Sequence, residues 1–309
     1  MRKIGILALL VALLAGVGVS QTVIYGPGSL RIFNSPYSGP HTIVRDSKAN
    51  LYVIYRHSVG TLGQYDVQIA KSADNGATWN MNWQTGFAAL GGDFGNYSPC
   101  IAIDSKDNLY CAWYHRVAFT GSRLPTTIRY NRFDATTSTW GTEWTVTPSL
   151  TYTRPNPVLA VDSNDFVWFM HGNSGWGSLL LKSNLPSATD GKFTTFSPSP
   201  GAQQHCNVTI DKNDYVHVTW YDTASYAGVK HSWIDPSATT PAWTKFSLSN
   251  HGPTNTSARA EYHSRLCADF AGNLFATYNA DDQAPSSGPP GDTETSARPS
   301  ARSTPTSAT

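Results

Sequence analysis

The feature that most constrains the fold of this 309-residue chain is a repeat centred on five aspartates. When the sequence is aligned on these residues, the flanks match from six positions before each aspartate to eleven after it, without a gap. The aspartates stand 58, 58, 49 and 58 residues apart, and they are Asp46, Asp104, Asp162, Asp211 and Asp269. Self-similarity at such a period is typical of a fold assembled from one repeated supersecondary unit.

Each copy of the repeat predicts a β-hairpin. A large apolar residue stands three positions before the aspartate, as Ile101 does before Asp104, and alternation around it indicates a strand with one buried face. Three turn residues follow, and then a second apolar stretch such as Leu109 to Tyr114. Roughly 30 residues separate consecutive hairpins, which leaves room for two more strands, such as Val67 to Lys71. Four strands per repeat predict an all-β fold, a β-propeller of four-stranded blades.

The composition agrees with an all-β fold and excludes one class of partner. Aromatic residues make up 12 % of the chain, beside 25 Gly and 19 Pro, and these types favour strands and turns over helices. Only 14 % of residues are charged and the formal net charge is +1, which is too neutral to hold a nucleic acid by charge alone. We therefore expect no nucleic-acid partner.

The N-terminal segment has the features of an export signal. Met1 to Lys3 places two positive charges before an apolar run from Ile4 to Val19, and small residues end at Ser20. This order predicts a signal peptide over residues 1–20, because the run is shorter than the roughly 20 apolar residues that a membrane anchor needs. We expect the propeller domain to span residues 21–282 of a secreted or periplasmic protein, with no membrane attachment after cleavage.

The C-terminal segment differs in composition from the repeat region. Of the 27 residues in 283–309, 22 are Ser, Thr, Pro, Ala or Gly, and none is aromatic or a large aliphatic. Such a segment cannot bury a core, so the sequence predicts a disordered tail.

Four cysteines are spread over the repeats, and no two have the close spacing of a zinc or redox site. Cys100 and Cys111 fall on two neighbouring expected strands, where a disulfide is one possibility. Buried free thiols behave as small apolar residues, and we favour that interpretation for all four, including Cys206 and Cys267.

One turn between two expected strands carries a specific motif. Residues 72–79 have the form S-x-D-x-G-x-T-W, which resembles the Asp box of the sialidase, or BNR-repeat, superfamily of propellers. Asp74 can accept turn N–H groups, Gly76 can take a positive φ, and Trp79 can pack on the blade. The resemblance implies a propeller fold in which the box, Ser72 included, is structural and lies on the face opposite the active site.

The number of blades stays open at this point. The fifth repeat supplies two strands that end near Asp281, after which the low-complexity tail begins. The ring either has five blades with an imperfect fifth, or is part of a six- or seven-bladed molecule, and we favour the larger molecule. Thr22 to Phe33 could supply an outer strand that closes the ring.

Propeller geometry predicts a site without any catalytic motif. Residues just before the first strand of each blade and just after the second converge on one face around the axis. We expect His57, His115 and Asp222, which share one repeat offset, to be accessible there. The residues expected to be catalytic are Asp222, Glu261, Tyr221, His115 and His205. The residues expected to bind substrate are Arg56, His57, Arg116, Arg154, His171 and His263.

A structural interpretation stands beside this functional one. A single histidine at a repeat position is often a packed, hydrogen-bonded residue rather than a catalyst. The five repeat aspartates lie in turns at the opposite end of the blades, where we expect them to accept backbone N–H groups and not to act on a substrate.

The side chains at the expected mouth suit a carbohydrate ligand. Arginine pairs with the carboxylate of an anionic sugar and a carboxylic acid protonates a leaving oxygen, so we expect a glycoside hydrolase acting on an anionic glycan. The expected set of side chains is similar to the active site of sialidases, which use an arginine triad, an acid Asp, and a Tyr activated by Glu. Their early Arg-Ile-Pro motif appears here as Arg31-Ile32-Phe33, so their catalytic set does not transfer to this chain.

Two other functions fit the same residues. A polysaccharide lyase would use Arg and His to neutralise a uronate carboxylate while His or Tyr removes the C5 proton. A glycan-binding or cell-surface propeller would use the fold without catalysis. We expect a monomer with no cofactor, and no metal because no His-x-x-x-His spacing occurs.

Overall fold

The chain forms five antiparallel β-sheets, here numbered sheets 1 to 5, and one 3-10 helix, η2 (Pro186–Ala188). The computed structural model describes residues 32–33, 41–58, 65–84, 95–116, 126–150, 156–172, 177–197, 199–201, 204–221, 229–248, 265–269 and 271–277. The expected signal peptide (1–20) and tail (283–309) lie outside these residues. No helix within the described ranges is long and apolar enough to cross a membrane.

The strands follow the repeat. Sheet 1 contains β1 (Ile32–Phe33), β2 (Ile43–Arg45), β3 (Leu51–Ser58), β4 (Tyr65–Ser72) and β5 (Asn80–Gln84). Sheet 2 contains β6 (Gly95–Ile103), β7 (Leu109–Arg116), β8 (Thr126–Asp134), β9 (Thr139–Trp140) and β10 (Trp144–Leu150). Sheet 3 contains β11 (Val158–Val161), β12 (Val167–Gly172), β13 (Ser178–Ser183) and β14 (Phe193–Thr195). Sheet 4 contains β15 (Gln204–Ile210), β16 (Val216–Tyr221), β17 (Val229–Ile234) and β18 (Thr244–Ser247). Sheet 5 contains β19 (Arg265–Ala268) and β20 (Leu274–Thr277).

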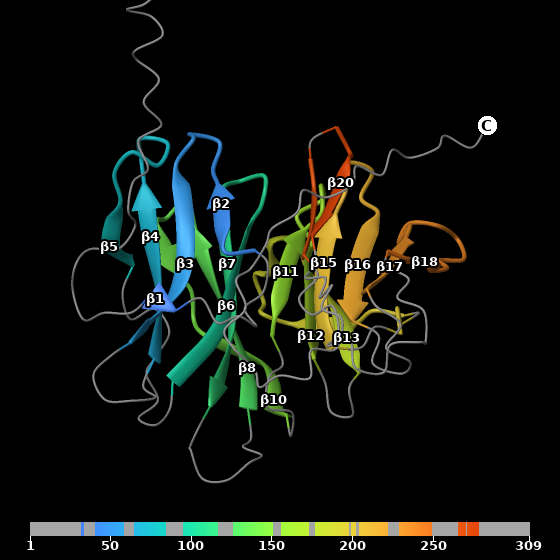
Figure 1. Cartoon of the computed structure of the whole chain (residues 1–309). Coiled ribbons are helices and arrows are strands. Elements are labelled where there is room, and N and C mark those ends of the chain that lie inside the picture. The colour runs from blue at the N-terminus through green and yellow to red at the C-terminus, as the bar shows by residue number, and fades with distance from the viewer. Residues whose placement is uncertain are drawn as a thin grey trace, which may run out of the picture.

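Consecutive sheets pack face to face in chain order, as the blades of a β-propeller do (Figure 1). The first hairpin strand of each sheet contacts the preceding sheet: β6 contacts β3 and β4, β11 contacts β6 and β7, and β19 contacts β15 and β16. The expected all-β propeller fold is confirmed.

The repeat aspartates organise the hairpin turns, as expected. In sheet 2, Asp104 Oδ1 accepts the N–H groups of Lys106 and Asn108, both at 2.9 Å. Its Oδ2 accepts the side-chain amide of Asn108 at 2.8 Å and the hydroxyl of Tyr110. Asp46 makes the same four types of contact in sheet 1. One carboxylate thus satisfies the turn and the start of the next strand, which explains why the residue recurs.

The S-x-D-x-G-x-T-W turn joins β4 to β5 with the expected geometry. Asp74 Oδ1 accepts the Thr78 N–H at 2.8 Å, and the Ser72 Oγ accepts the Gly76 N–H at 2.8 Å. Gly76 has φ +94°, a conformation that costs other residues free energy, and its carbonyl accepts the Trp79 indole N–H at 3.1 Å. Because β4 runs away from Arg56, this turn lies at the opposite end of sheet 1.

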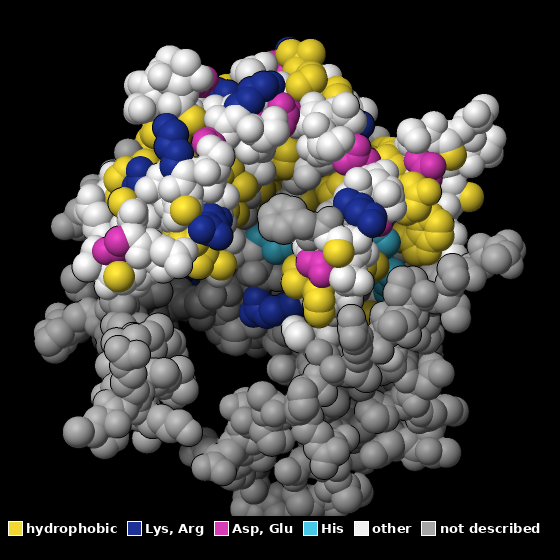
Figure 2. All heavy atoms as spheres, turned by 90° about the horizontal axis from the view of Figure 1, so that it is seen from above, with side chains coloured by type: hydrophobic (Ala, Val, Ile, Leu, Met, Phe, Trp, Pro, Cys, Tyr) yellow, Lys and Arg dark blue, Asp and Glu magenta, His cyan; other side chains and the backbone are white. Residues whose placement is uncertain are grey.

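Figure 2 looks onto the end of the molecule at which the aspartate turns lie. Its positive and negative side chains are scattered among uncharged ones and do not gather into a patch of one sign. This face therefore offers no surface for a polyanion held by charge.

A second repeated contact joins neighbouring sheets at the turn end. The N–H of Ser47 in sheet 1 donates to Asp107 Oδ1 of sheet 2 at 2.8 Å, and that of Ser105 donates to Asp165 of sheet 3 at 3.1 Å. The third copy links Ser163 of sheet 3 to sheet 4. Each serine follows a repeat aspartate directly, so the same short motif builds the turn and fixes the next sheet.

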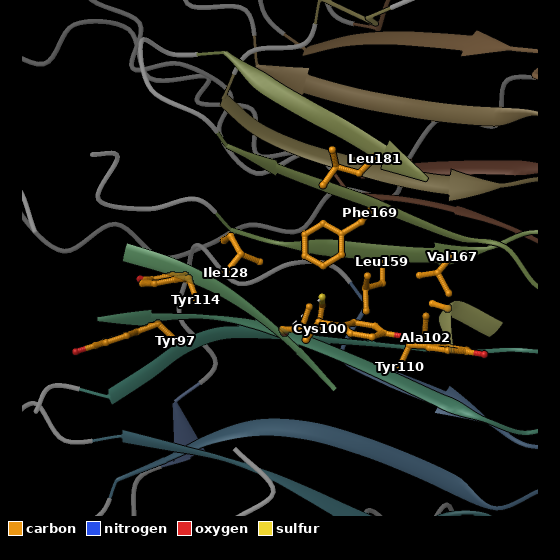
Figure 3. Packing of buried hydrophobic residues seen from close by; sticks show 13 residues of the cluster. Tyr97, Cys100, Ala102, Tyr110, Tyr114, Ile128, Leu159, Val167, Phe169 and Leu181 are labelled. Carbon is orange, nitrogen blue, oxygen red and sulfur yellow. Dashed lines mark hydrogen bonds between the residues drawn. The ribbon is translucent and has the colours of Figure 1, made fainter. Parts of the chain in front are cut away.

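Three apolar clusters fill the spaces between sheets. Tyr110 and Phe169 belong to the cluster between sheets 2 and 3 (Figure 3). Trp113 packs between sheets 1 and 2, and Trp168 and Trp220 pack between sheets 3 and 4. Burial of such a side chain contributes about 1.5–3 kcal/mol, so these clusters hold the blades together.

A contact at the centre of the molecule joins three of the five sheets that the described residues form. Nδ1 of His41, just before β2, lies 2.6 Å from the carbonyl oxygen of Leu159 in sheet 3. Its Nε2 lies 3.4 Å from the carbonyl oxygen of Leu266 in sheet 5. One imidazole thus connects sheets 1, 3 and 5, which favours five blades with two described strands in the fifth over a larger ring.

The N-terminal strand lies elsewhere than expected. Ile32 pairs with His57 and Phe33 with Arg56, on the edge of β3 that β2 also occupies. The described end of the Thr22 to Phe33 segment therefore extends the inner edge of sheet 1, and the expectation of an outer closing strand is wrong for these residues.

All four cysteines are free thiols. Cys100 pairs with Ala112 and Cys111 with Ile101, so pleating directs the two sulfur atoms to opposite faces of sheet 2 and excludes a disulfide. Cys206 is buried as well, which confirms the expectation for three cysteines. The expectation of a buried thiol is wrong for Cys267, because this residue of β19 is exposed.

Candidate functional site

The expected mouth lies at the end of the sheets opposite the aspartate turns. The second hairpin strands β3, β7, β12 and β16 end there, and His57, His115 and His171 stand at or near the ends of three of them. Arg154, Asp222, Glu261 and His263 lie outside the described residues. For Arg116, His205 and Tyr221 only the backbone strand is described. Their convergence around the axis stays a prediction.

A half-buried arginine between aromatic rings is the most distinctive feature of this end. The guanidinium carbon of Arg56 lies 4.1 Å from the ring centroid of Tyr65 and 5.3 Å from that of Tyr97. Tyr97 in turn stacks on Tyr114 with ring centroids 5.2 Å apart. Cation–π contacts fix the plane of the guanidinium, so Arg56 is held in one orientation between sheets 1 and 2.

The close approach of the two sheets at this point depends on Gly95. Its φ is +96°, and a Cβ atom there would lie 2.4 Å from the backbone nitrogen of Tyr65. Any other residue would push β6 away from β4 and separate Tyr97 from Arg56.

A hydrogen-bonded network lies on the other face of sheet 1. The Tyr55 hydroxyl donates to Gln68 Oε1 at 2.9 Å, and the Gln68 amide donates to His57 Nδ1 at 3.0 Å. A neutral His57 ring therefore carries its proton on Nε2. The network fixes the ring orientation and the tautomer of a half-buried histidine at the mouth.

Asp66 is a residue that the sequence prediction missed. It pairs with His57 across β3 and β4, and its side chain accepts the Val67 N–H at 2.7 Å. Only 4 % of Asp66 is exposed, and burial raises the pKa of its carboxyl group above the usual value. Among the described residues it is the one carboxyl group at this end of the sheets. Because it begins a third strand, a rule based on the first two strands could not find it.

Two of the predicted histidines are buried. His115 is 7 % exposed, so the expectation that it is accessible is wrong. His171 is fully buried, its Nδ1 donates to the Gly172 carbonyl at 2.9 Å, and burial lowers its pKa. Arg56 and His57 are only half-buried, and they are the predicted site residues with described side chains that a ligand can reach most directly.

The inner strands bulge next to this end. The pairing of β6 with β7 shifts between Tyr97 and Cys100, and Ser98 within the bulge has φ +46°. The buried Ser98 hydroxyl donates to Asn156 Oδ1 of sheet 3 at 3.1 Å, and Asn156 has φ +37°. Such bulges redirect side chains and are frequent beside binding sites.

A metal centre finds no support in the described ranges, where no group of three or more His, Cys, Asp or Glu side chains could hold an ion. The chemistry available there is that of a fixed guanidinium, tyrosine hydroxyls, an imidazole and a carboxyl group whose pKa is raised by burial. These groups can bind a carboxylate and donate a proton.

No protein-family model matches this sequence, and no curated protein matches it significantly. Solved structures do match. A protein of unknown function from Dyadobacter fermentans aligns with a TM-score of 0.53 and 12 % identity, over 82 % of this chain and 80 % of its own. An α-L-arabinofuranosidase from Fusarium graminearum, in complex with an iminosugar inhibitor, aligns with a TM-score of 0.51 and 14 % identity, over 79 % and 68 %. At these identities the similarity concerns the fold, and it agrees with the β-propeller.

Proposed function

We propose that this protein is an exported, sialidase-like propeller that hydrolyses an anionic glycan at the end of the sheets where β3 and β7 end. The observation that carries the proposal is Arg56, held between Tyr65 and Tyr97 and reachable from solvent. An oriented guanidinium can pair bidentately with a sugar carboxylate, whereas a mobile lysine cannot.

Asp66 is the candidate for the acid, and it is buried on the face of sheet 1 opposite to Arg56, so the proposal requires the substrate to reach around the end of β3 and β4. Glycoside hydrolysis needs a carboxylic acid that keeps its proton until the leaving oxygen requires it. Burial raises the pKa of Asp66 in that direction, and the adjacent His57 is fixed by Gln68. The arabinofuranosidase among the structural neighbours is consistent with a glycosidase on this fold. A shared fold alone does not identify the substrate.

The alternative of a uronate lyase has one observation in its favour. Near Arg56 the described residues offer one carboxyl group but several tyrosines and histidines. A lyase needs no carboxylate pair, because Arg neutralises the uronate and Tyr or His removes the C5 proton. The third candidate is a glycan-binding propeller without turnover.

The test compares Arg56→Ala and Asp66→Asn with Arg45→Ala, an exposed arginine of β2 at the opposite end of sheet 1. Sialylated oligosaccharides and uronate polymers serve as substrates, with released sugar and the absorbance of an unsaturated product as readouts. We expect Arg56→Ala to lower turnover at least tenfold, about 1.4 kcal/mol, and Arg45→Ala to leave it unchanged.

The outcomes separate the three functions. Released sugar without absorbance supports the hydrolase, and unsaturated product supports the lyase. Glycan binding without turnover, lost in Arg56→Ala, supports the lectin-like protein. If the Arg45 and Arg56 variants behave equally in every assay, Arg56 is not part of a glycan-binding site and the proposal is refuted.

A further inference from the structure

The face of sheet 4 that points toward sheet 5 is polar, whereas the same face of sheets 2 and 3 is mostly apolar. In sheet 2 it carries Cys100, Ala102, Tyr110, Ala112 and Tyr130. In sheet 3 it carries Val158, Ala160, Trp168, Met170 and Leu180. At the equivalent positions sheet 4 carries Asn207, Thr209, His217, Thr219 and His231. All five are at most 9 % exposed, so sheets 4 and 5 meet through buried polar groups.

His217 stands where sheets 1 to 3 have a donor that does not titrate near neutral pH. The Tyr52 hydroxyl donates to Asp46 at 3.0 Å, and the Trp168 indole N–H donates to Asp162 at 3.0 Å. In sheet 4 the same position is an imidazole, whose Nε2 lies 3.4 Å from Asp211 Oδ2. This turn therefore has a titratable imidazole as the neighbour of its aspartate.

The cation that lies near the turn aspartate in sheet 3 is also replaced. In sheet 3, Lys182 lies opposite Trp168, with its Nζ 3.8 Å from Asp162 Oδ2. In sheet 4 the residue opposite His217 is Trp233. The residue at that position therefore carries no positive charge to balance the negative charge of the Asp211 carboxylate.

The second histidine completes a buried chain of three groups. Nδ1 of His217 lies 3.1 Å from Nε2 of His231, and the two rings stack with centroids 5.3 Å apart and 11° between planes. With both rings neutral, the Nε2–H of His231 donates to Nδ1 of His217. Nε2 of His217 then lies near Asp211 without a well-aligned hydrogen bond, so the pair is held in a buried site where one polar atom has no hydrogen-bond partner.

The other titratable and charged groups around this face can be placed. Tyr215, which precedes β16, stacks on Trp233. From sheet 5, β19 brings the half-buried Arg265 and the exposed Cys267. By their register with Trp220 and Ser232, Lys230 and Lys245 belong to the other face of sheet 4. At the turn end, the Lys212 side chain lies against Gly272 of sheet 5, and Asp269 accepts N–H groups of its own turn. Among the described residues, Asp211 is the anion in contact with His217.

We propose that Asp211, His217 and His231 form an acid-sensitive contact that loosens sheet 4, and the docking of sheet 5 on it, as the pH falls below neutral. Sheet 5 depends on this face, because the Asn207 amide donates to the Leu266 carbonyl at 3.3 Å. The serine–aspartate contact of the other sheets is missing here, since Lys212 and Gly272 occupy its positions.

The direction of the effect follows from proton linkage. Burial lowers the pKa of both histidines, and that of His231 to about 4, from an ordinary value of 6.5. Between these two pH values the unfolded chain binds more protons than the folded one. Stability is therefore complete above about pH 7 and falls as the pH drops toward 4.

The test restores the residues that the repeat uses elsewhere. His217→Tyr with His231→Leu copies Tyr110 of sheet 2 and Leu180 of sheet 3. The folding equilibrium constant is measured by urea unfolding at about pH 7.5 and about pH 4.5. The buried His41 and His171 are present in both proteins, so their contributions cancel. We expect the constant of the unaltered protein to fall about 50-fold more than that of the variant.

Two further measurements keep the proposal open to refutation. If the variant does not fold, NMR titration of the unaltered protein decides, and a midpoint of 6.5 or above for both His217 and His231 would overturn the proposal. Hydrogen exchange locates the effect, with amides of β19 and β20 expected to lose protection at acid pH before those of β11 and β12. The proposal is contradicted if the folding equilibrium constant falls equally in the unaltered protein and the variant. It is also contradicted if the amides of all sheets lose protection at the same pH.

Discussion

Two isoleucines at the same repeat position should differ in their contribution to stability. Ile43 and Ile101 both stand three residues before a repeat aspartate, and in sheets 2 to 4 this position is fully buried against the preceding sheet. Ile101 has no exposed surface and packs with Trp113 and Ile54. Ile43 is 54 % exposed, because sheet 1 has no full sheet before it within the described residues.

The magnitude follows from the cavity that each substitution leaves. Ile101→Ala removes three buried carbon atoms between sheets 1 and 2, for which core substitutions of this kind cost about 2–5 kcal/mol. Ile43→Ala removes atoms that are already half in water, and about 1 kcal/mol or less is expected.

Urea unfolding of both variants, with the slope compared as well as the midpoint, measures this difference. Equal losses would show that the open face of sheet 1 is covered as tightly as the others. The order of sheets deduced from the contacts would then have to be revised.

Three further predictions concern turns, sheet contacts and thiols. Asp74→Ala should lower the melting temperature and leave glycan turnover or binding unchanged, because the turn lies at the far end of sheet 1; a loss of activity without a change in melting would contradict this. Asp165→Ala should lower the free energy of unfolding by about 1–3 kcal/mol in urea titrations, because it removes the acceptor of the Ser105 N–H and the partner of Lys106 at 2.8 Å. A thiol reagent should modify Cys267 in the folded protein and the other three cysteines only after unfolding, and rapid reaction of more than one thiol would refute the burial.

The fold could be predicted from the sequence because the repeat has a physical cause at each position. Asp104 and its equivalents organise turns, and the apolar positions around them fill the spaces between sheets. The pairing of Ile32 and Phe33 with β3 could not be predicted, because a two-residue strand leaves no periodic signal.

The sequence predicted the end of the sheets at which Arg56 and His57 lie, but it did not predict the burial of their neighbours. The offset rule correctly placed Arg56 and His57 at one end of the sheets, because symmetry of position follows from symmetry of sequence. It could not show that His115 is buried, because exposure depends on what packs above a residue and not on its offset. Asp66 was missed because its burial is not revealed by the alternation in β4.

The proposed site is tested most directly by a crystal structure of the protein with a uronate or sialyl oligosaccharide. We expect a sugar carboxylate within hydrogen-bonding distance of the Arg56 guanidinium and beside Tyr65. A glycan bound at another face, with Arg56 and Tyr65 unchanged and free of ligand, would contradict the account.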